Sequence, residues 1–251
     1  MSDEIIKLKD LIENSKSIYA LTGAGISTNA GIPDFRGPMG IYTTRRYDPD
    51  KTFDINYFLI YPKYFYDFAR DFITLLEKIK PTFTHFFLSK LEKLGKLKGV
   101  ITQNIDMLHE RAGSKNIINL HGSIEKSFCI DCKKEYSLEE MKEMIFKVDV
   151  PRCSICDGLI KPNIVFFGEA VFDFDKAIEW IKNADLLLVI GTSLKVSPAN
   201  IIPLYTKGRV AIINKGDISL SNIKYDLYIN SDIDEVFKSL DKILCLEVKD
   251  D

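Results

Sequence analysis

Four of the five cysteines form the most specific pattern in this sequence. Cys129 and Cys132 make one C-x2-C pair, and Cys153 and Cys156 make a second pair after a gap of twenty residues. The two-residue spacing lets one tight turn present two sulfur atoms to one ion, and two such turns complete a tetrahedral zinc site. Four thiolates leave no position for water or substrate, so the pattern predicts one structural zinc ion. A redox pair or ordinary buried cysteines are the less specific interpretations.

A glycine-rich turn follows the first strand-like run. Residues 17–22 are apolar and lead directly into Gly23, Ala24 and Gly25. In dinucleotide-binding folds, such glycines let backbone N–H groups approach a pyrophosphate. A Gly-x-Gly turn by itself is also common where no ligand binds, so it favours a nucleotide site only together with other motifs.

His121 has the best context for proton transfer among the three histidines. It follows the strand-like run 117–120, and an imidazole at a strand end can act as a general base because its pKa is near neutrality. Without a further motif, a hydrogen-bonded structural histidine is the more common interpretation. His85 and His109 lack such a context, and we expect both to be satisfied structural residues.

Short apolar runs alternate with helical patterns along the chain. This alternation predicts an α/β fold with a doubly wound, Rossmann-like parallel sheet, whose ligands bind at the carboxyl ends of the strands. The expected strands are 17–22, 99–102, 117–120, 186–190, 210–213 and 227–229, and the main expected helices are 63–79, 83–94, 137–146, 173–181 and 234–243.

The composition excludes several classes of protein. The chain is 46% hydrophobic and 28% charged, as in ordinary globular proteins. A net charge of -2 supplies no positive field for nucleic acid or for an anionic membrane. No apolar run approaches the length of a membrane span, and the charged N-terminal residues are unlike a signal peptide. We therefore expect a cytoplasmic protein that binds neither nucleic acid nor membranes.

The glycine-rich turn begins a longer motif. Residues 23–37 read GAGISTNAGIPDFRG, which resembles the signature of the sirtuins, the NAD-dependent protein-lysine deacylases. The other blocks of that family follow in order, so that the resemblance spans about residues 15–240. These blocks are TQNID at 102–106, LHG at 120–122, the two cysteine pairs, VFFGE at 165–169, GTSL at 191–194, VSPA at 196–199 and IN at 213–214.

The resemblance implies a reaction that consumes NAD as a co-substrate. His121 would deprotonate the ribose hydroxyls after the acyl oxygen of lysine has displaced nicotinamide, and Asn104 would order the ribose and a water. The products would be nicotinamide, O-acyl-ADP-ribose and free lysine. The implied NAD contacts are Gly23, Ala24, Gly25, Ser27, Asp34, Phe35, Arg36, Gln103, Asn104, Ile105, Asp106, Gly191, Thr192, Ser193, Asn214, Asp232 and Ile233.

The same resemblance implies that acyl-lysine proteins or peptides are the other substrate. The main chain around Gly168 and Glu169 and around residues 194–196 would clamp the peptide as an added strand, a mode that gives affinity through backbone hydrogen bonds. The implied substrate contacts are Val165, Phe166, Phe167, Gly168, Glu169, Leu194 and Val196.

Two stretches interrupt the alternation of strands and helices. Residues 38–57 lack periodicity and are expected to form a long loop. The insertion 123–158 is too small for a core of its own, so zinc would supply its stability. One sirtuin catalytic domain is therefore expected over 1–251. Its parts would be a Rossmann-like core at 1–37, 98–122 and 159–251, an NAD-binding loop and helical segment at 38–97, and a zinc-binding module at 123–158.

The expected helix at 63–79 bears on the choice of acyl group. Sirtuins that prefer succinyl or malonyl groups carry Tyr-x-x-Arg there, but this chain has Tyr66 and Ala69, with Arg70 one place late. On a helix, Ala69 and Arg70 flank opposite sides of Tyr66. We expect acetyl or longer neutral acyl groups to be preferred, while Arg45, Arg46 and Arg70 keep the acid-selective alternative open.

Three other functions compete with deacylation. A protein ADP-ribosyltransferase would use the same NAD site, although His121 favours deacylation. A zinc-ribbon binding module on an inert nucleotide fold is opposed by the full set of catalytic residues. A hydride-transferring dehydrogenase is disfavoured because the glycine-rich turn leads into residues 32–36 and not into a continuous helix.

Overall fold

The structure is a computed structural model that describes residues 2–33, 47–220 and 222–244. The strands are β1 (Ile18–Thr22), β2 (Leu97–Thr102), β3 (Ile117–Asn119), β4 (Gly122–Cys129), β5 (Glu135–Ser137), β6 (Ile160–Ile164), β7 (Leu186–Ile190), β8 (Arg209–Asn214) and β9 (Leu227–Asn230). The helices are α1 (Asp3–Glu13), α3 (Pro49–Thr52), α4 (Ile55–Ile60), α5 (Lys63–Lys78), α6 (Phe83–Lys93), α7 (Leu108–Ala112), α8 (Leu138–Ile145), α9 (Phe174–Lys182), α10 (Ile233–Asp241) and the 3-10 helices η1 (Ala24–Ala30) and η2 (Ala199–Tyr205).

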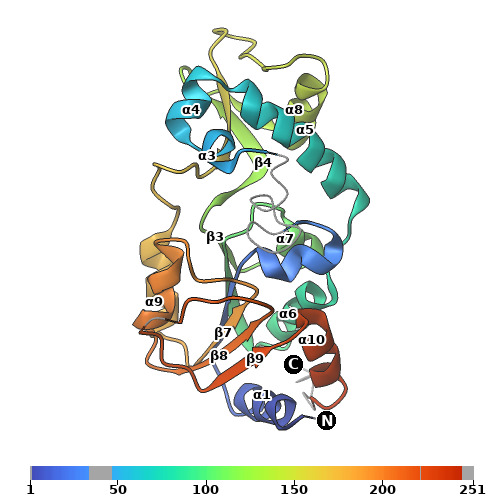
Figure 1. The fold of residues 1–251 in the computed structure, drawn as a ribbon, viewed down its shortest axis with the longest axis vertical. Coiled ribbons are helices and arrows are strands. Elements are labelled where there is room, and N and C mark those ends of the chain that lie inside the picture. Colours follow the sequence, from blue (N-terminus) through green and yellow to red (C-terminus); the bar gives the residue numbers. More distant parts are fainter. Residues whose placement is uncertain (1, 34–46, 221, 245–251) are drawn as a thin grey trace.

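A six-stranded parallel sheet organises the larger lobe (Figure 1). Its strands lie in the order β3-β2-β1-β7-β8-β9, and each neighbouring pair is parallel. The order reverses between β1 and β7, which is the arrangement of a doubly wound sheet. β7 is buried along its whole length, which explains why its sequence is continuously apolar and does not alternate.

Two hydrophobic cores cover the two faces of this sheet. Ile18 and Ala20 of β1 point into one core, whereas Leu21 points into the other. The first core is closed by α1, α6 and α10, and the second by α9 and η2. The predicted α/β, doubly wound class is therefore confirmed.

An antiparallel sheet of three strands, in the order β5-β4-β6, organises the smaller lobe together with α3, α4, α5 and α8 (Figure 1). Phe58 and Phe65 of its helices share one core with Ile124, Ile160 and Phe166. The cysteine insertion therefore has no separate core of its own, as expected, but it is not without a core. Its sheet packs against aromatic residues of α4 and α5. The sequence by itself assigns these aromatic residues to a separate segment.

The expected loop 38–57 is partly helical. The side chain of Asp48 accepts a hydrogen bond from the backbone of Lys51 to begin α3, and that of Asp54 accepts one from Tyr57 to begin α4. These helices have four and six residues, too few to show a 3.6-residue periodicity, so only their caps could have revealed them.

Packing groups two elements differently from the expected module boundaries. α6, from the segment 38–97, packs in a core of the large sheet. β6, from the range 159–251, pairs with β4 of the small sheet. The module boundaries stay a proposal. Every helix within the described residues is too short or too polar to cross a bilayer.

Candidate active site and metal centre

The turns after β1 and β7 meet where the strand order reverses. A Cβ added to Gly23 would lie 2.8 Å from the Cβ of Thr192, and one added to Gly25 would lie 2.8 Å from the Cα of Gly191. The backbone N–H of Gly25 donates to the carbonyl of Gly191 at 2.8 Å. The close approach of the two turns therefore requires these glycines. The edge of the sheet beside them, where the strand order reverses, is the place where doubly wound sheets bind ligands.

Three polar side chains form a network near this edge of the sheet. The Ser27 hydroxyl donates to the Asp106 carboxylate at 2.7 Å, and the Asn104 amide donates to Ser27 Oγ at 3.1 Å and to Asp106 at 3.2 Å. The backbone N–H of Leu108 donates to the other oxygen of Asp106 at 2.9 Å. Burial raises the pKa of Asp106, while the hydrogen bonds from Leu108 and Ser27 act to lower it. The network fixes the orientation of the Asn104 amide.

Gln103 connects the ends of two strands. Its Nε2 donates to the carbonyl of Thr22 at 3.3 Å and to the Thr192 hydroxyl at 3.0 Å. Its backbone N–H also donates to the carbonyl of Thr22 at 3.0 Å. Gln103 is therefore held by the residues that end β1 and follow β7, and its own carbonyl contacts His121.

His121 is held in one tautomer by that carbonyl. Its Nδ1 lies 2.8 Å from the carbonyl oxygen of Gln103. A carbonyl oxygen only accepts, so we assign the proton to Nδ1, which leaves Nε2 of the neutral ring with a free electron pair. Burial lowers the pKa of His121, although the contact with Gln103 acts to raise it. A neutral imidazole with an unprotonated Nε2 can serve as a general base near neutral pH.

The other two histidines lie together in the interior. Thr22 Oγ1 is 2.9 Å from Nε2 of His109, Thr82 Oγ1 is 2.8 Å from Nδ1 of His85, and the two ring centroids are 4.6 Å apart. Within the described part of the chain, His85 Nε2 and His109 Nδ1 have no hydrogen-bond partner. Burial lowers the pKa of His85 to about 3 and that of His109 well below its usual value, so both rings are neutral. They are structural, but the expectation that they are fully satisfied is wrong.

The predicted contacts of the adenosine half lie at the ends of β7, β8 and β9. Ser193 follows β7, and its carbonyl accepts a hydrogen bond from Ser219 at 2.8 Å. Asn214 ends β8, is buried, and donates its amide to the carbonyl of Gly216 at 3.3 Å. Both therefore stand at the carboxyl edge of the sheet. Ala24 opens η1, and Ile105 stands half-buried beside Asp106.

Asp232 and Ile233 have structural contacts of their own. The Asp232 carboxylate accepts a hydrogen bond from the Asn29 side chain at 3.0 Å and caps α10. The Ile233 side chain is 5% exposed and belongs to the core beneath the large sheet. A contact from Ile233 to a nucleotide would therefore have to come from its backbone. Asp34, Phe35 and Arg36 lie outside the described residues.

The segment 165–169 is anchored on both sides. The backbone N–H of Val165 donates to the carbonyl of His121 at 2.9 Å. Phe167 donates to the carbonyl of Phe53 at 2.7 Å and accepts from the N–H of Ile55 at 3.1 Å. The segment thus links the candidate base to the helices of the small lobe.

The remaining substrate candidates differ in exposure. Phe166 is buried against Phe58 and Phe65, whereas Gly168, with φ of +96°, stands in an exposed turn before Glu169. On the second loop, Leu194 is buried and Val196 is half-buried. Leu194 also has a φ of +51°, an uncommon conformation for a side chain of its size.

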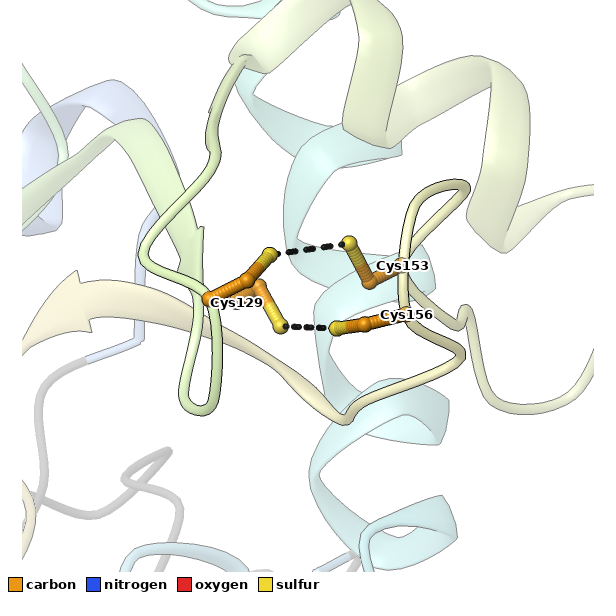
Figure 2. A group of neighbouring side chains, drawn as sticks. Cys129, Cys153 and Cys156 are labelled. Carbon is orange, nitrogen blue, oxygen red and sulfur yellow. Dashed lines mark hydrogen bonds between the residues drawn. The ribbon is translucent and has the colours of Figure 1, made fainter.

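The four cysteines converge from two turns (Figure 2). Their sulfur atoms lie within 4.8 Å of one another, with Cys129 and Cys156 at 3.5 Å and Cys132 and Cys153 also at 3.5 Å. These separations are too long for disulfides. Tetrahedral zinc–sulfur bonds of about 2.3 Å would separate the sulfurs by about 3.8 Å. The cluster therefore fits a four-thiolate zinc ion, which all four residues would hold.

Tyr136 is a residue near the metal centre that the sequence did not single out. Its hydroxyl donates to Cys153 Sγ at 3.2 Å and accepts a hydrogen bond from the backbone N–H of Ser154 at 3.0 Å. A contact of this kind orients a metal-binding sulfur. Tyr136 reaches the sulfur because β5 pairs with β4, a pairing for which the sequence held no motif.

The comparisons with known proteins agree on one family. The model of the Sir2 family matches residues 23–198. A Thermotoga maritima protein named NAD-dependent protein deacetylase is 45% identical over 87% of this chain and 91% of its own length. A Sulfurisphaera tokodaii protein of the same name is 42% identical over 92% of each chain.

Solved structures give the same result. A structure described as Sir2 with a p53 peptide and NAD+ has a TM-score of 0.87 and 41% identity, covering 96% of this chain and 98% of that one. A structure of Sir2Tm bound to a propionylated peptide has a TM-score of 0.85 and 40% identity, covering 95% and 98%. The span matched by the family model includes the polar network, His121 and all four cysteines.

Proposed function

The chain belongs to the Sir2 family, and from that premise we propose that it is an NAD-dependent protein deacetylase that also accepts longer neutral acyl groups. The single observation that carries the proposal is the contact between His121 and the carbonyl of Gln103. Its Nδ1 is engaged by the carbonyl of Gln103 at 2.8 Å, so its Nε2 is available as a base.

The polar network would hold the reacting end of NAD. When NAD is bound, its nicotinamide ribose offers an electrophilic carbon to the acyl oxygen of lysine. That oxygen is a weak nucleophile, so alignment and exclusion of water must lower the barrier, and positioning can supply several kcal/mol. Asn104, oriented by Ser27 and Asp106, is placed to align the ribose.

His121 would remove a proton from a ribose hydroxyl through Nε2. The resulting imidazolium would carry protons on both nitrogens, and the carbonyl of Gln103 already accepts the one on Nδ1. That hydrogen bond would stabilise the charged ring and keep its orientation. Gln103 is itself fixed by Thr22 and Thr192.

The peptide would bind against main chain that is already tied to the base. Segment 165–169 is bonded to His121 through the N–H of Val165. A peptide added as a strand beside Gly168 and Glu169 would therefore have a fixed register relative to His121. Residues 194–196 would form the opposite side of the clamp.

The proposed preference for neutral acyl groups rests on a small cavity. The cavity has a volume of about 30 Å³, and its lining includes Phe65, Phe68, Ala69 and Ile105 but no charged residue. The cavity has room for about one methyl group, so a longer apolar chain would have to widen it, gaining free energy from each buried methylene, whereas a carboxylate would have to stay solvated or find a partner.

Arg70 is directed elsewhere. Its guanidinium donates to the carbonyl of Ile145 at 3.0 Å and to that of Asp149 at 3.2 Å, and it also pairs with Asp67. It is therefore already engaged, and it does not line the cavity. Arg45 and Arg46 lie outside the described residues.

The test is an incubation of the protein with NAD and an acetyl-lysine peptide, followed by mass analysis of the products. We expect deacetylated peptide, nicotinamide and O-acetyl-ADP-ribose from the wild-type protein. His121→Ala should form these products only at a small fraction of the wild-type rate. A peptide that keeps its acetyl group and gains ADP-ribose would instead establish the transferase. Formation of NADH would establish a dehydrogenase.

A further inference from the structure

Lys161 is a buried charged residue that the proposed reaction does not use. Its side chain is only 5% exposed, in β6 of the small sheet. A buried ammonium is unfavourable unless it is paired and hydrogen-bonded, because it has lost its hydration. Burial lowers the pKa of Lys161, while the Glu169 carboxylate acts to raise it.

The partners of Lys161 lie mainly on one short segment. Its Nζ donates to the carbonyl of Ile164 at 2.7 Å and pairs with the Glu169 carboxylate at 2.9 Å. It also stands over the ring of Phe166, 4.6 Å from the centroid, within cation–π range. A single ammonium therefore contacts the start, the middle and the end of the segment 164–169.

Glu169 completes the arrangement. Its carboxylate accepts a second hydrogen bond, from the backbone N–H of Phe166 at 2.8 Å, and its own N–H donates to the carbonyl of Phe166 at 3.0 Å. The carboxylate is thus turned toward its own segment. The bend at Gly168 is held from inside by Lys161, and the main chain of the bend remains at the surface.

We propose that Lys161 is a positioning residue that fixes the shape of segment 164–169 for peptide binding, through its contacts with Ile164, Phe166 and Glu169. The inference rests on the proposed function, because it assumes that this segment receives the acyl-lysine peptide. Without the ammonium, the segment loses its internal anchor while the NAD-side network, which contains neither Lys161 nor Glu169, stays intact. The KM for the peptide should therefore rise, while the KM for NAD should stay near that of the wild type.

The experiment measures kcat and the KM values for peptide and NAD in Lys161→Met, Lys161→Arg and Glu169→Gln. Lys126→Met is the matched control, because Lys126 lies in the same sheet but is 60% exposed in its pair with Glu135. We expect K161M and E169Q to raise the peptide KM about tenfold, with NAD KM and kcat within about twofold to threefold of wild type. K161R should fall between K161M and wild type because it keeps the charge, and K126M should match wild type.

Two further measurements separate positioning from simple stability. Each variant should retain one zinc per chain, and the double variant K161M/E169Q should be no worse than K161M alone, since the two residues act as a pair. If K161M does not fold, K161R and E169Q decide the question by the same criterion. Unchanged peptide KM values would overturn the inference. So would an equal rise in the KM values for peptide and NAD that is accompanied by loss of zinc. A wild-type protein that does not deacetylate the peptide would instead overturn the proposed function.

Discussion

The polar network at the strand ends and the cysteine cluster of the small lobe are held together by different means. Ser27, Asn104 and Asp106 form hydrogen bonds with one another at the edge of a sheet whose two faces are covered by cores. Of the four cysteines, Cys129 and Cys153 are buried, whereas Cys132 and Cys156 are exposed, and Ile155, between two ligands, is 70% exposed. Hydrogen bonds within the fold fix the network, whereas a bound ion would tie the two cysteine pairs together.

This difference separates chemistry from stability. A network fixed by a covered sheet can lose one side chain and keep its fold, while a cluster fixed by metal loses its local structure with any one ligand. Variants in the two regions should therefore have opposite signatures. The predictions below are ordered by the size of the expected effect.

Cys129→Ala should have the largest effect on folding. Three thiolates hold zinc far less well than four, and structural zinc contributes on the order of 10 kcal/mol to the folding of small zinc domains. We expect zinc content well below one per chain and a lower melting temperature of the small lobe. Trp180, the one tryptophan of the sequence, packs on Tyr19 in the large lobe and reports separately on that lobe.

Ser154→Ala is the control for this variant, because Ser154 lies beside Cys153 in the same turn but is not a ligand. It should keep its zinc. Full zinc occupancy and wild-type stability in Cys129→Ala would show that the cluster does not depend on four thiolates.

His121→Ala should have the opposite signature. Loss of a general base lowers kcat by about 10²-fold or more, which corresponds to about 2.7 kcal/mol. The melting temperature and zinc content should stay near those of the wild type, because His121 is only half-buried and its hydrogen-bond partner is a backbone carbonyl. Turnover near the wild-type rate would remove His121 from the mechanism.

Stability should fall in mild acid because of the buried histidines. Burial lowers the pKa of His85 to about 3 and that of His109 well below 6.5. At a pH between the lowered pKa of the folded protein and the ordinary pKa of about 6.5, the unfolded chain binds more protons than the folded one. The free energy of unfolding therefore decreases as the pH drops below about 6.5. Each histidine contributes up to about 1.4 kcal/mol per pH unit, while the raised pKa of Asp106 acts in the opposite sense.

Urea unfolding followed by Trp180 fluorescence at several pH values measures this slope. His85→Asn removes one titrating ring and should reduce the slope by about one proton, whatever its effect on absolute stability. An unchanged slope would mean that His85 does not stay neutral in the folded protein.

Acyl selectivity should show the smallest effect. Succinyl-lysine should have a kcat/KM about tenfold below that of acetyl-lysine and butyryl-lysine on one peptide, because its carboxylate finds no cation in the cavity lining. Arg70→Gln should leave this ratio unchanged, since its guanidinium is bound to the carbonyls of Ile145 and Asp149. A higher kcat/KM for succinyl-lysine than for acetyl-lysine would contradict the proposed preference for neutral acyl groups. A change of this ratio in Arg70→Gln would show that Arg70 contacts the acyl group.

The parallel sheet could be predicted from the sequence, whereas the small sheet could not. β7 and the four central residues of β8 are apolar, and helical patterns separate the strands. β6, in contrast, reads IKPNI, and a proline with polar neighbours argues against a strand. It is tolerated because β6 lies at the edge of the small sheet and Lys161 is paired.

The motifs named the candidate site residues but not their contacts. No motif shows that Gly25 packs on Gly191, or that the carbonyl of Gln103 selects the tautomer of His121. Both contacts depend on strand pairing that brings residues far apart in sequence to one edge. Ile233 shows a second limit of the motifs. The resemblance names it as an NAD contact, but its side chain is part of a hydrophobic core.

The measurement that tests the central claim most directly is the ratio of nicotinamide released to lysine freed from an acetyl-lysine peptide. If the network and His121 couple NAD cleavage to deacetylation, the ratio is one, and omission of NAD stops the release of lysine. Lysine freed without nicotinamide, or nicotinamide released while the acetyl group stays on the peptide, would contradict the account.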